Sequence, residues 1–173
     1  MTAARDAEAV DGGAARRPRR AARLAATQAL YQVLLTNAPA ENVVAEFQKF
    51  RREGESETNA LGGADLTLFA DVVRGAAARR EEIEAALQRV LAADWPLERI
   101  ETLLRAVLWA GAYEIMARPD VPLEVVINEY VEIAHAFFAG KEPSFVNGVL
   151  DRLAREFRIT PEAAQRGGSA QGE

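Results

Sequence analysis

The stretch PLEVVINEYVEIAHAF, residues 122–137, decides the fold class of this chain. Its large apolar residues Val126, Tyr130, Ile133 and Phe137 follow one another at intervals of four, three and four. This spacing places them on one face of an α-helix, whereas a half-buried strand would alternate polar and apolar residues. Pro122 suits the beginning of such a helix, because the first turn needs no backbone N–H donor. The stretch therefore predicts an amphipathic helix with one buried face.

Five further helices of the same kind are predicted around this stretch. They cover residues 19–36, 40–52, 65–91, 97–117 and 144–158, and Asp65 can cap the third of them. No segment alternates polar and apolar residues for long enough to predict a strand. Six amphipathic helices with short connections predict an all-α fold, either one bundle or two packed three-helix bundles.

The two ends of the chain lack this periodicity and are rich in alanine and glycine. We therefore expect three parts: a disordered tail with a basic arm over residues 1–17, a helical domain over 18–159 and a second disordered tail over 160–173. Residues 53–64 are expected to form a loop within the domain, because they contain glycine, serine and asparagine.

The composition argues against an enzyme. The chain has no cysteine and a single histidine, His135, which excludes thiol nucleophiles, zinc fingers and iron–sulfur clusters. It has no glycine-rich phosphate loop, and Ser144 is interpreted as the residue that starts a helix. No apolar run is long enough to cross a bilayer. We therefore expect a cytoplasmic protein without catalysis, cofactor, metal or membrane contact.

The basic residues are concentrated near the N-terminus, although the net charge is −5. Residues 14–40 contain no acidic residue and five arginines, namely Arg16, Arg17, Arg19, Arg20 and Arg23. A local patch of this kind attracts a polyanion at contact distance, because salt screens charges that lie more than about 10 Å away. The guanidinium group also makes forked, bidentate bonds to phosphate. The patch favours nucleic-acid binding, although an arginine run can also be a solvated flank.

Pro18 is expected to keep the preceding residues extended, so that an arginine arm joins an arginine-bearing helix and grips phosphates from two directions. Gln28 and Tyr31 follow on the same helix. A glutamine can bond the edge of a base, and an exposed tyrosine can stack on an unpaired base, which favours single-stranded RNA as the ligand. Tyr31 fits a place in the core nearly as well.

Three segments, in this order and spacing, resemble the NusB family. The first is RRAAR (19–23) with TQALY (27–31), the second is LLR (103–105) with GAYEI (111–115), and the third is DVP (120–122) with VINE (126–129) and FVNGVLD (145–151). The resemblance covers residues 19–158. It implies an all-α fold of two packed three-helix bundles and a transcription antitermination factor that is not an enzyme and uses no cofactor.

The resemblance also implies ligands and site residues. The family binds the boxA element of ribosomal RNA leader transcripts together with NusE, a ribosomal protein, and joins RNA polymerase and other Nus factors. The expected RNA-binding residues, which include the whole arginine cluster, are Arg16, Arg17, Arg19, Arg20, Arg23, Gln28, Tyr31, Lys141, Phe145 and Asn147. The expected residues at the protein partner's surface are Tyr113, Glu114 and Arg105.

Two alternatives and one departure remain open. The chain could be a helical protein-interaction module that does not bind RNA, in which case the arginines are incidental. It could also form a homodimer that hides the basic face. Trp109 stands where the family often has an arginine, which replaces a charge with a large apolar side chain.

Overall fold

The computed structural model describes the backbone of residues 3–53 and 63–158 and the side chains of residues 15–50 and 63–158. Its helices are α1 (Ala3–Thr36), α2 (Ala40–Glu53), α3 (Leu66–Ala78), α4 (Arg80–Val90), the 3₁₀ helix η1 (Leu97–Arg99), α5 (Thr102–Ala117), α6 (Leu123–Phe137) and α7 (Glu142–Phe157). The part of the chain that the structure describes contains no strand, and the predicted all-α fold is confirmed. Most of the predicted loop and the predicted C-terminal tail lie outside the described residues.

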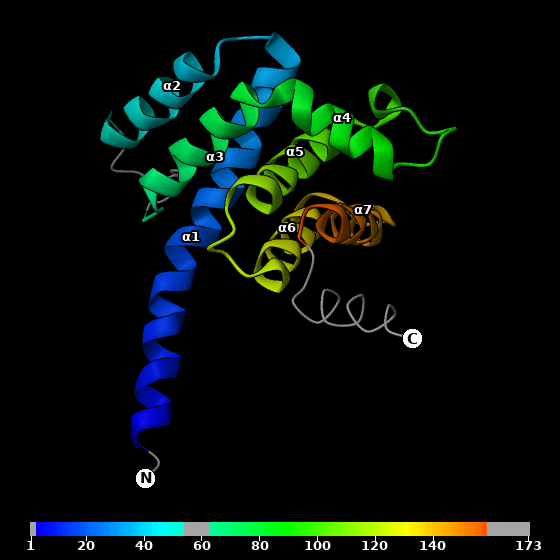
Figure 1. Cartoon of the computed structure of the whole chain (residues 1–173). Coiled ribbons are helices and arrows are strands. Elements are labelled where there is room, and N and C mark those ends of the chain that lie inside the picture. Colours follow the sequence, from blue (N-terminus) through cyan, green and yellow to red (C-terminus); the bar gives the residue numbers. More distant parts are fainter. Residues whose placement is uncertain (1–2, 54–62, 159–173) are drawn as a thin grey trace, which may run out of the picture.

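Helix α5 is the centre of the fold (Figure 1). It contacts α1 and α3 on one side and α4, α6 and α7 on the other. Helices α1, α2 and α3 pack on one another, as do α5, α6 and α7, and α4 packs against α5 and α7. Ten consecutive residues of α5, from Ala106 to Ile115, are therefore buried between α1 and α3 on one side and α4, α6 and α7 on the other. This arrangement matches the predicted pair of packed bundles.

The predicted helix over residues 65–91 was wrong in one respect, because it is two helices. The backbone leaves the helical conformation at Arg79 (φ −101°, ψ 23°), although the N–H of Arg79 still bonds the carbonyl of Gly75 at 3.1 Å. This turn directs α4 toward α7, while α3 stays against α1 and α2. The predicted cap is confirmed, since the carboxylate of Asp65 accepts a hydrogen bond from the N–H of Leu68 at 3.0 Å.

Two other predicted helix starts were shifted. The helix predicted from residue 97 begins as the short 3₁₀ helix η1, and α5 starts only at Thr102, where the carboxylate of Glu101 accepts a hydrogen bond from the N–H of Leu103. Helix α7 starts at Glu142, before Ser144, because Pro143 fits its first turn and needs no donor there. Ser144 is therefore not the cap of this helix.

The expected extended arm before Pro18 was wrong. Helix α1 runs without interruption from Ala3 to Thr36, and Pro18 lies inside it. The carbonyl of Pro18 accepts a hydrogen bond from the N–H of Asp65 at 2.9 Å, which ties this turn of α1 to the start of α3. The arginines of this region therefore occupy fixed positions on a helix. The division of the chain into tail, domain and tail stays a prediction.

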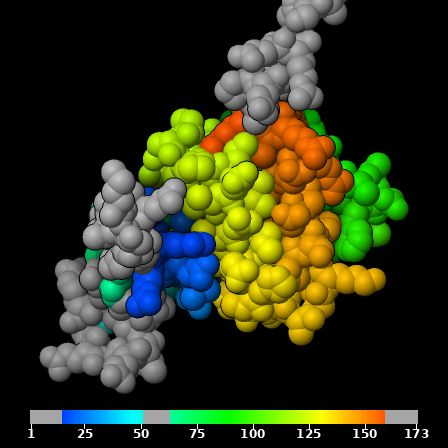
Figure 2. Space-filling model, turned by 90° about the horizontal axis from the view of Figure 1, so that it is seen from below, coloured from blue at the N-terminus to red at the C-terminus, as the bar shows by residue number. Residues whose placement is uncertain are grey.

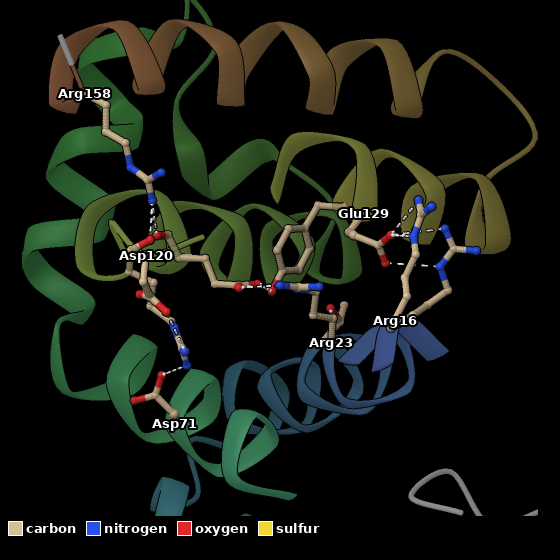
Figure 3. A network of polar contacts seen from close by, with 11 residues as sticks. Arg16, Arg23, Asp71, Asp120, Glu129 and Arg158 are labelled. Atoms are coloured by element: carbon tan, nitrogen blue, oxygen red, sulfur yellow. Dashed lines mark hydrogen bonds and ion pairs between the residues drawn. The ribbon is translucent and has the colours of Figure 1, made fainter. Parts of the chain in front are cut away.

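A buried cluster of three polar side chains joins α1, α5 and α6 (Figure 3). Arg23 of α1 donates two hydrogen bonds to the carboxylate of Glu114 of α5, at 2.8 and 3.0 Å. The hydroxyl of Tyr130 of α6 donates to the same carboxylate at 2.6 Å. Burial alone would lower the pKa of Arg23, but the hydrogen bonds and the charge of Glu114 raise it overall. The three helices thus share one satisfied polar centre.

Arg158, directly after α7, caps the C-terminal end of α5. Its guanidinium group donates hydrogen bonds to the carbonyl oxygens of Glu114, Ile115, Arg118 and Val121, at 2.5–3.0 Å. The last carbonyls of a helix lack partners within the helix, and a cation is favourable at that end. This contact fixes the turn between α5 and α6, which forms one wall of the groove described below.

We expect Glu114→Gln to destabilise the protein strongly. The change leaves the buried Arg23 cation without its counter-charge, which costs about 3–5 kcal/mol for a buried pair. The double variant Arg23→Met/Glu114→Gln removes both charges and keeps an acceptor for the hydroxyl of Tyr130. Its loss in the free energy of unfolding, measured with urea, is expected to be smaller than the sum of the two single losses. Additive losses would contradict a coupled pair.

We expect Gly75→Ala to destabilise the protein and Gly148→Ala to stabilise it. A Cβ at position 75 would overlap the ring of Tyr113, which would be pushed away from its hydrogen bond to Asp71. Overpacking of this kind costs about 1–3 kcal/mol. At position 148 the nearest atom is the end of Arg152 at 3.7 Å, so the higher helix propensity of alanine should add about 0.5–1 kcal/mol. Thermal unfolding of both variants tests this contrast, and equal shifts would contradict it.

Candidate functional site

A groove of about 630 Å³ lies where α1, the start of α3, the α5–α6 turn and α6 meet. Figure 2 shows this face of the molecule, with α1 in blue beside α6 in yellow. The groove is lined by four arginines and four acidic residues, namely Arg16, Arg19, Arg23, Arg118, Asp65, Asp120, Glu124 and Glu129. Because the charges of both signs are balanced, the binding properties of the groove depend on which arginines are already paired.

Glu129 of α6 pairs with two arginines of α1 (Figure 3). Arg16 donates from Nε and Nη2 to Oε1 of Glu129, both at 3.4 Å. Arg20 donates from Nε to Oε2 at 3.1 Å and from Nη2 to Oε1 at 3.2 Å. The side chain of Glu129 is 1% exposed, whereas those of Arg16 and Arg20 are 66% and 48% exposed. A buried carboxylate thus holds two arginines at the surface.

Arg17 and Arg19 are two cations of α1 that have no partner among the side chains that the structure describes. Both are exposed, and neither forms a hydrogen bond or an ion pair with any residue whose side chain is described. Arg19 lines the groove. Their guanidinium groups are therefore available to an anionic ligand.

Arg118 is neutralised by acidic neighbours. It donates to Asp71 at 2.9 Å and to Asp120 at 3.3 Å. Asp71 also accepts a hydrogen bond from the hydroxyl of Tyr113 at 2.9 Å. Burial, together with this bond to Asp71, raises the pKa of Tyr113 to about 12. This wall of the groove is a closed network and offers little positive charge to a ligand.

Three of the predicted site residues lie in the interior. Arg23 was expected to bind RNA, but it is 3% exposed and fully engaged with Glu114. Tyr113 and Glu114 were expected at a partner surface, yet they are 7% and 0% exposed. In this structure these three side chains are bonded inside the fold, Arg23 to Glu114 and Tyr113 to Asp71, and their predicted roles stay predictions. Arg105, the third predicted partner residue, is half-buried and donates to Glu84 at 3.0 Å.

The remaining predicted residues of α1 are half-buried. Gln28 and Tyr31 are partly accessible, and Tyr31 packs against the hydrophobic core. Trp109, which stands where the family often has an arginine, also lies in the interior. Its side chain is fully buried, and the guanidinium group of Arg80 lies over its ring at 5.4 Å from the centroid. None of these residues joins the group of free arginines.

Lys141, Phe145 and Asn147 form a second patch at the start of α7. Lys141 and Asn147 are exposed, and the half-buried ring of Phe145 packs on the exposed ring of Trp95, with 5.8 Å between the centroids. Helix α6 lies between α1 and α7 (Figure 2). The structure therefore brings Arg16, Arg17, Arg19 and Arg20 together and separates them from this patch.

Sequence reasoning missed Glu129, although a signal for it was present. Glu129 lies between Val126 and Ile133, three and four positions away, and therefore on the apolar stripe of α6. A carboxylate on a buried stripe needs a cationic partner. Arg23 gives the same signal, because it precedes Ala26 and Leu30 by three and seven positions on the stripe of α1.

The described residues offer neither a metal-binding cluster nor a membrane-spanning helix. No three side chains of the types His, Cys, Asp and Glu come together there in a way that could hold a metal ion. No helix in that part of the chain is both long and apolar enough to cross a membrane.

The comparisons with known proteins agree on one family. The NusB family matches residues 20–155. A transcription antitermination protein NusB of Caulobacter vibrioides is 50% identical over 141 residues, which are 82% of this chain and 95% of that protein. The protein of the same name from Novosphingobium aromaticivorans is 47% identical over 140 residues, covering 81% of this chain and 95% of the relative.

The solved structures show the same fold. NusB of T. maritima superposes with a TM-score of 0.61 at 30% identity, covering 86% of this chain and 97% of that chain. A structure of the antitermination factors NusB and NusE in complex with dsRNA contains a chain that matches with a TM-score of 0.64 at 21% identity, over 82% and 98% of the two chains. At that identity the second match supports the fold alone. The family match over most of the sequence, with relatives about half identical along nearly their whole length, shows that this chain belongs to the NusB family.

Proposed function

We propose that this protein is a transcription antitermination factor that binds single-stranded, boxA-type RNA of ribosomal RNA leader transcripts together with NusE. The observation that carries the proposal is the row of exposed arginines on α1, of which Arg17 and Arg19 have no partner among the described side chains. In this function the protein works in the cytoplasm with RNA polymerase and other Nus factors, and it performs no catalysis.

The distribution of charge supports an RNA ligand. The chain as a whole is acidic, with a net charge of −5, so it repels a polyanion over most of its surface. Only short-range contacts at the free arginines then favour binding, because salt screens the more distant acidic residues. Guanidinium groups also form bidentate bonds to phosphate oxygens. Binding is therefore expected to be local to α1 and strongly dependent on salt.

The second patch supports a single-stranded ligand. Unpaired bases stack on aromatic rings, and the exposed ring of Trp95 packed on Phe145 offers such a platform beside Lys141 and Asn147. A strand that crosses α6 would reach both the arginines of α1 and this platform. Bases in a duplex are already stacked and would not use it.

The proposed partner is NusE. One of the matching structures is of the antitermination factors NusB and NusE in complex with dsRNA. Because Tyr113 and Glu114 are buried here, we expect NusE to bind a surface that does not include them. Arg105 stays a candidate contact, since its side chain is 18% exposed.

We expect Arg17→Ala/Arg19→Ala to weaken binding of a short boxA-like single-stranded RNA. Neither residue bonds another described side chain, so the fold should be unaffected and the loss should come from phosphate contacts. Each lost contact lowers the slope of log K against log salt by about 0.7, so the double variant should show a slope shallower by about 1.4. Titrations at several salt concentrations measure this change.

The matched control is Arg99→Ala/Arg152→Ala, which removes two exposed arginines from η1 and α7 and should leave the slope unchanged. The titrations are repeated with NusE, which should tighten RNA binding by the wild type. If the protein binds no RNA in any mixture but still binds NusE, it is an interaction module and the proposal is wrong.

A further inference from the structure

We propose that Glu129 is a positioning residue for RNA binding. Its buried carboxylate holds the guanidinium groups of Arg16 and Arg20 side by side so that together they bind one phosphate of the RNA. This inference rests on the proposed function and adds a residue of opposite charge to the RNA-binding surface.

The hydrogen bonds leave part of each arginine unused. Arg16 and Arg20 both bind Glu129 through Nε and Nη2, so that the Nη1 atoms have no partner among the described residues. Arg16 and Arg20 lie four positions apart and therefore on the same face of α1. Two guanidinium groups with free N–H donors thus stand one helical turn apart on the same carboxylate (Figure 3).

The charges of this group do not cancel. One carboxylate faces two guanidinium groups, so an excess of one positive charge remains. It is accessible, because the arginines are 66% and 48% exposed while the carboxylate is 1% exposed. The neighbouring Arg23 does not change this count, since it is paired with Glu114. An anion at the surface therefore meets the arginines and not Glu129.

Glu129 orders the two arginines before a ligand arrives. A free arginine side chain has many rotamers, and fixing it on binding weakens the binding constant by a few-fold. Here a residue on the rigid backbone of α6 has already fixed two of them. The hydrogen bonds and charge of Glu129 also raise the pKa of Arg20, which shows that the contact is favourable for the charged form. The arginines of this pair are therefore preorganised, in contrast to Arg17 and Arg19.

The sign of the change in RNA affinity when Glu129 is replaced distinguishes a positioning role from simple repulsion between its charge and the RNA. Removing a negative charge near an RNA site should strengthen binding if the charge only repels the RNA. If Glu129 positions the arginines, its removal should weaken binding in spite of the more favourable net charge. The sign of the change in affinity therefore decides between the two.

The test is the affinity of Glu129→Gln for the same short single-stranded RNA. Glutamine keeps the size of the side chain but offers one acceptor and no charge to the two arginines. We expect affinity to fall by about fivefold. Glu132→Gln is the matched control, because Glu132 lies on the exposed side of α6 and acts on Arg20 through its charge alone. This control should bind RNA as tightly as the wild type or more tightly.

A double-mutant cycle shows whether the effect passes through the arginines. In an Arg16→Ala/Arg20→Ala background, adding Glu129→Gln should not weaken RNA binding further. Thermal unfolding establishes that each variant is folded at the assay temperature. Should a variant fail this check, the order parameters of the arginine Nε–H bonds in the wild type give an independent measurement by NMR. They should be higher for Arg16 and Arg20 than for Arg17 and Arg19, and equal values would overturn the inference.

The outcomes distinguish this inference from the proposed function. If the wild type binds RNA and Arg17→Ala/Arg19→Ala weakens binding, but Glu129→Gln binds as well as or better than the wild type, the positioning role is wrong and the function stands. If the wild type binds no RNA, both are wrong.

Discussion

The buried ion pair between Arg23 and Glu114, completed by the hydroxyl of Tyr130, is the contact on which the position of α1 depends. Two buried charges tolerate little displacement, because either charge without its partner would be costly. The pair therefore fixes both the rotation of α1 and its position along α5 and α6. Apolar packing alone would allow more sliding, because several alanines line the buried face of α1. The two groups of helices are joined in one register as a result.

This register determines which arginines reach the surface as free cations. Arg20 and Arg16 lie three and seven positions before Arg23, and so on the same face of α1, which brings them over Glu129. Arg17 and Arg19 point to either side of that line and find no carboxylate among the described residues. The arginines of α1 therefore have three roles. Arg23 forms the buried ion pair, Arg16 and Arg20 cover the carboxylate of Glu129, and Arg17 and Arg19 are exposed cations. The acidic residues of α5 and α6 decide which arginine performs which task.

The sequence predicted the helices well where burial alone determines the pattern. The apolar stripe of α6 and the cap at Asp65 were predicted correctly, because a helical period and a capping carboxylate are local signals. The break at Arg79 has no proline or glycine at that position, and it arises because α4 packs against α7 instead of continuing along α3. Pro18 was expected to keep its surroundings extended, and the structure accommodates it within α1. Such features depend on tertiary contacts that a local pattern does not contain.

The candidate site was harder to predict because residue type and residue position gave conflicting signals. Five arginines within eight residues favoured one basic surface, yet the position of Arg23 on the apolar stripe indicated a buried residue. Glu114 and Glu129 show the converse, since acidic residues on buried stripes need cations, and α1 supplies them. Where the two signals differ, position is the better guide, because a buried charge must be paired whereas an exposed one need not be. The acidic composition of the chain is therefore compatible with an RNA-binding surface: acids that hold arginines in place leave a positive excess at the surface while the net charge stays negative.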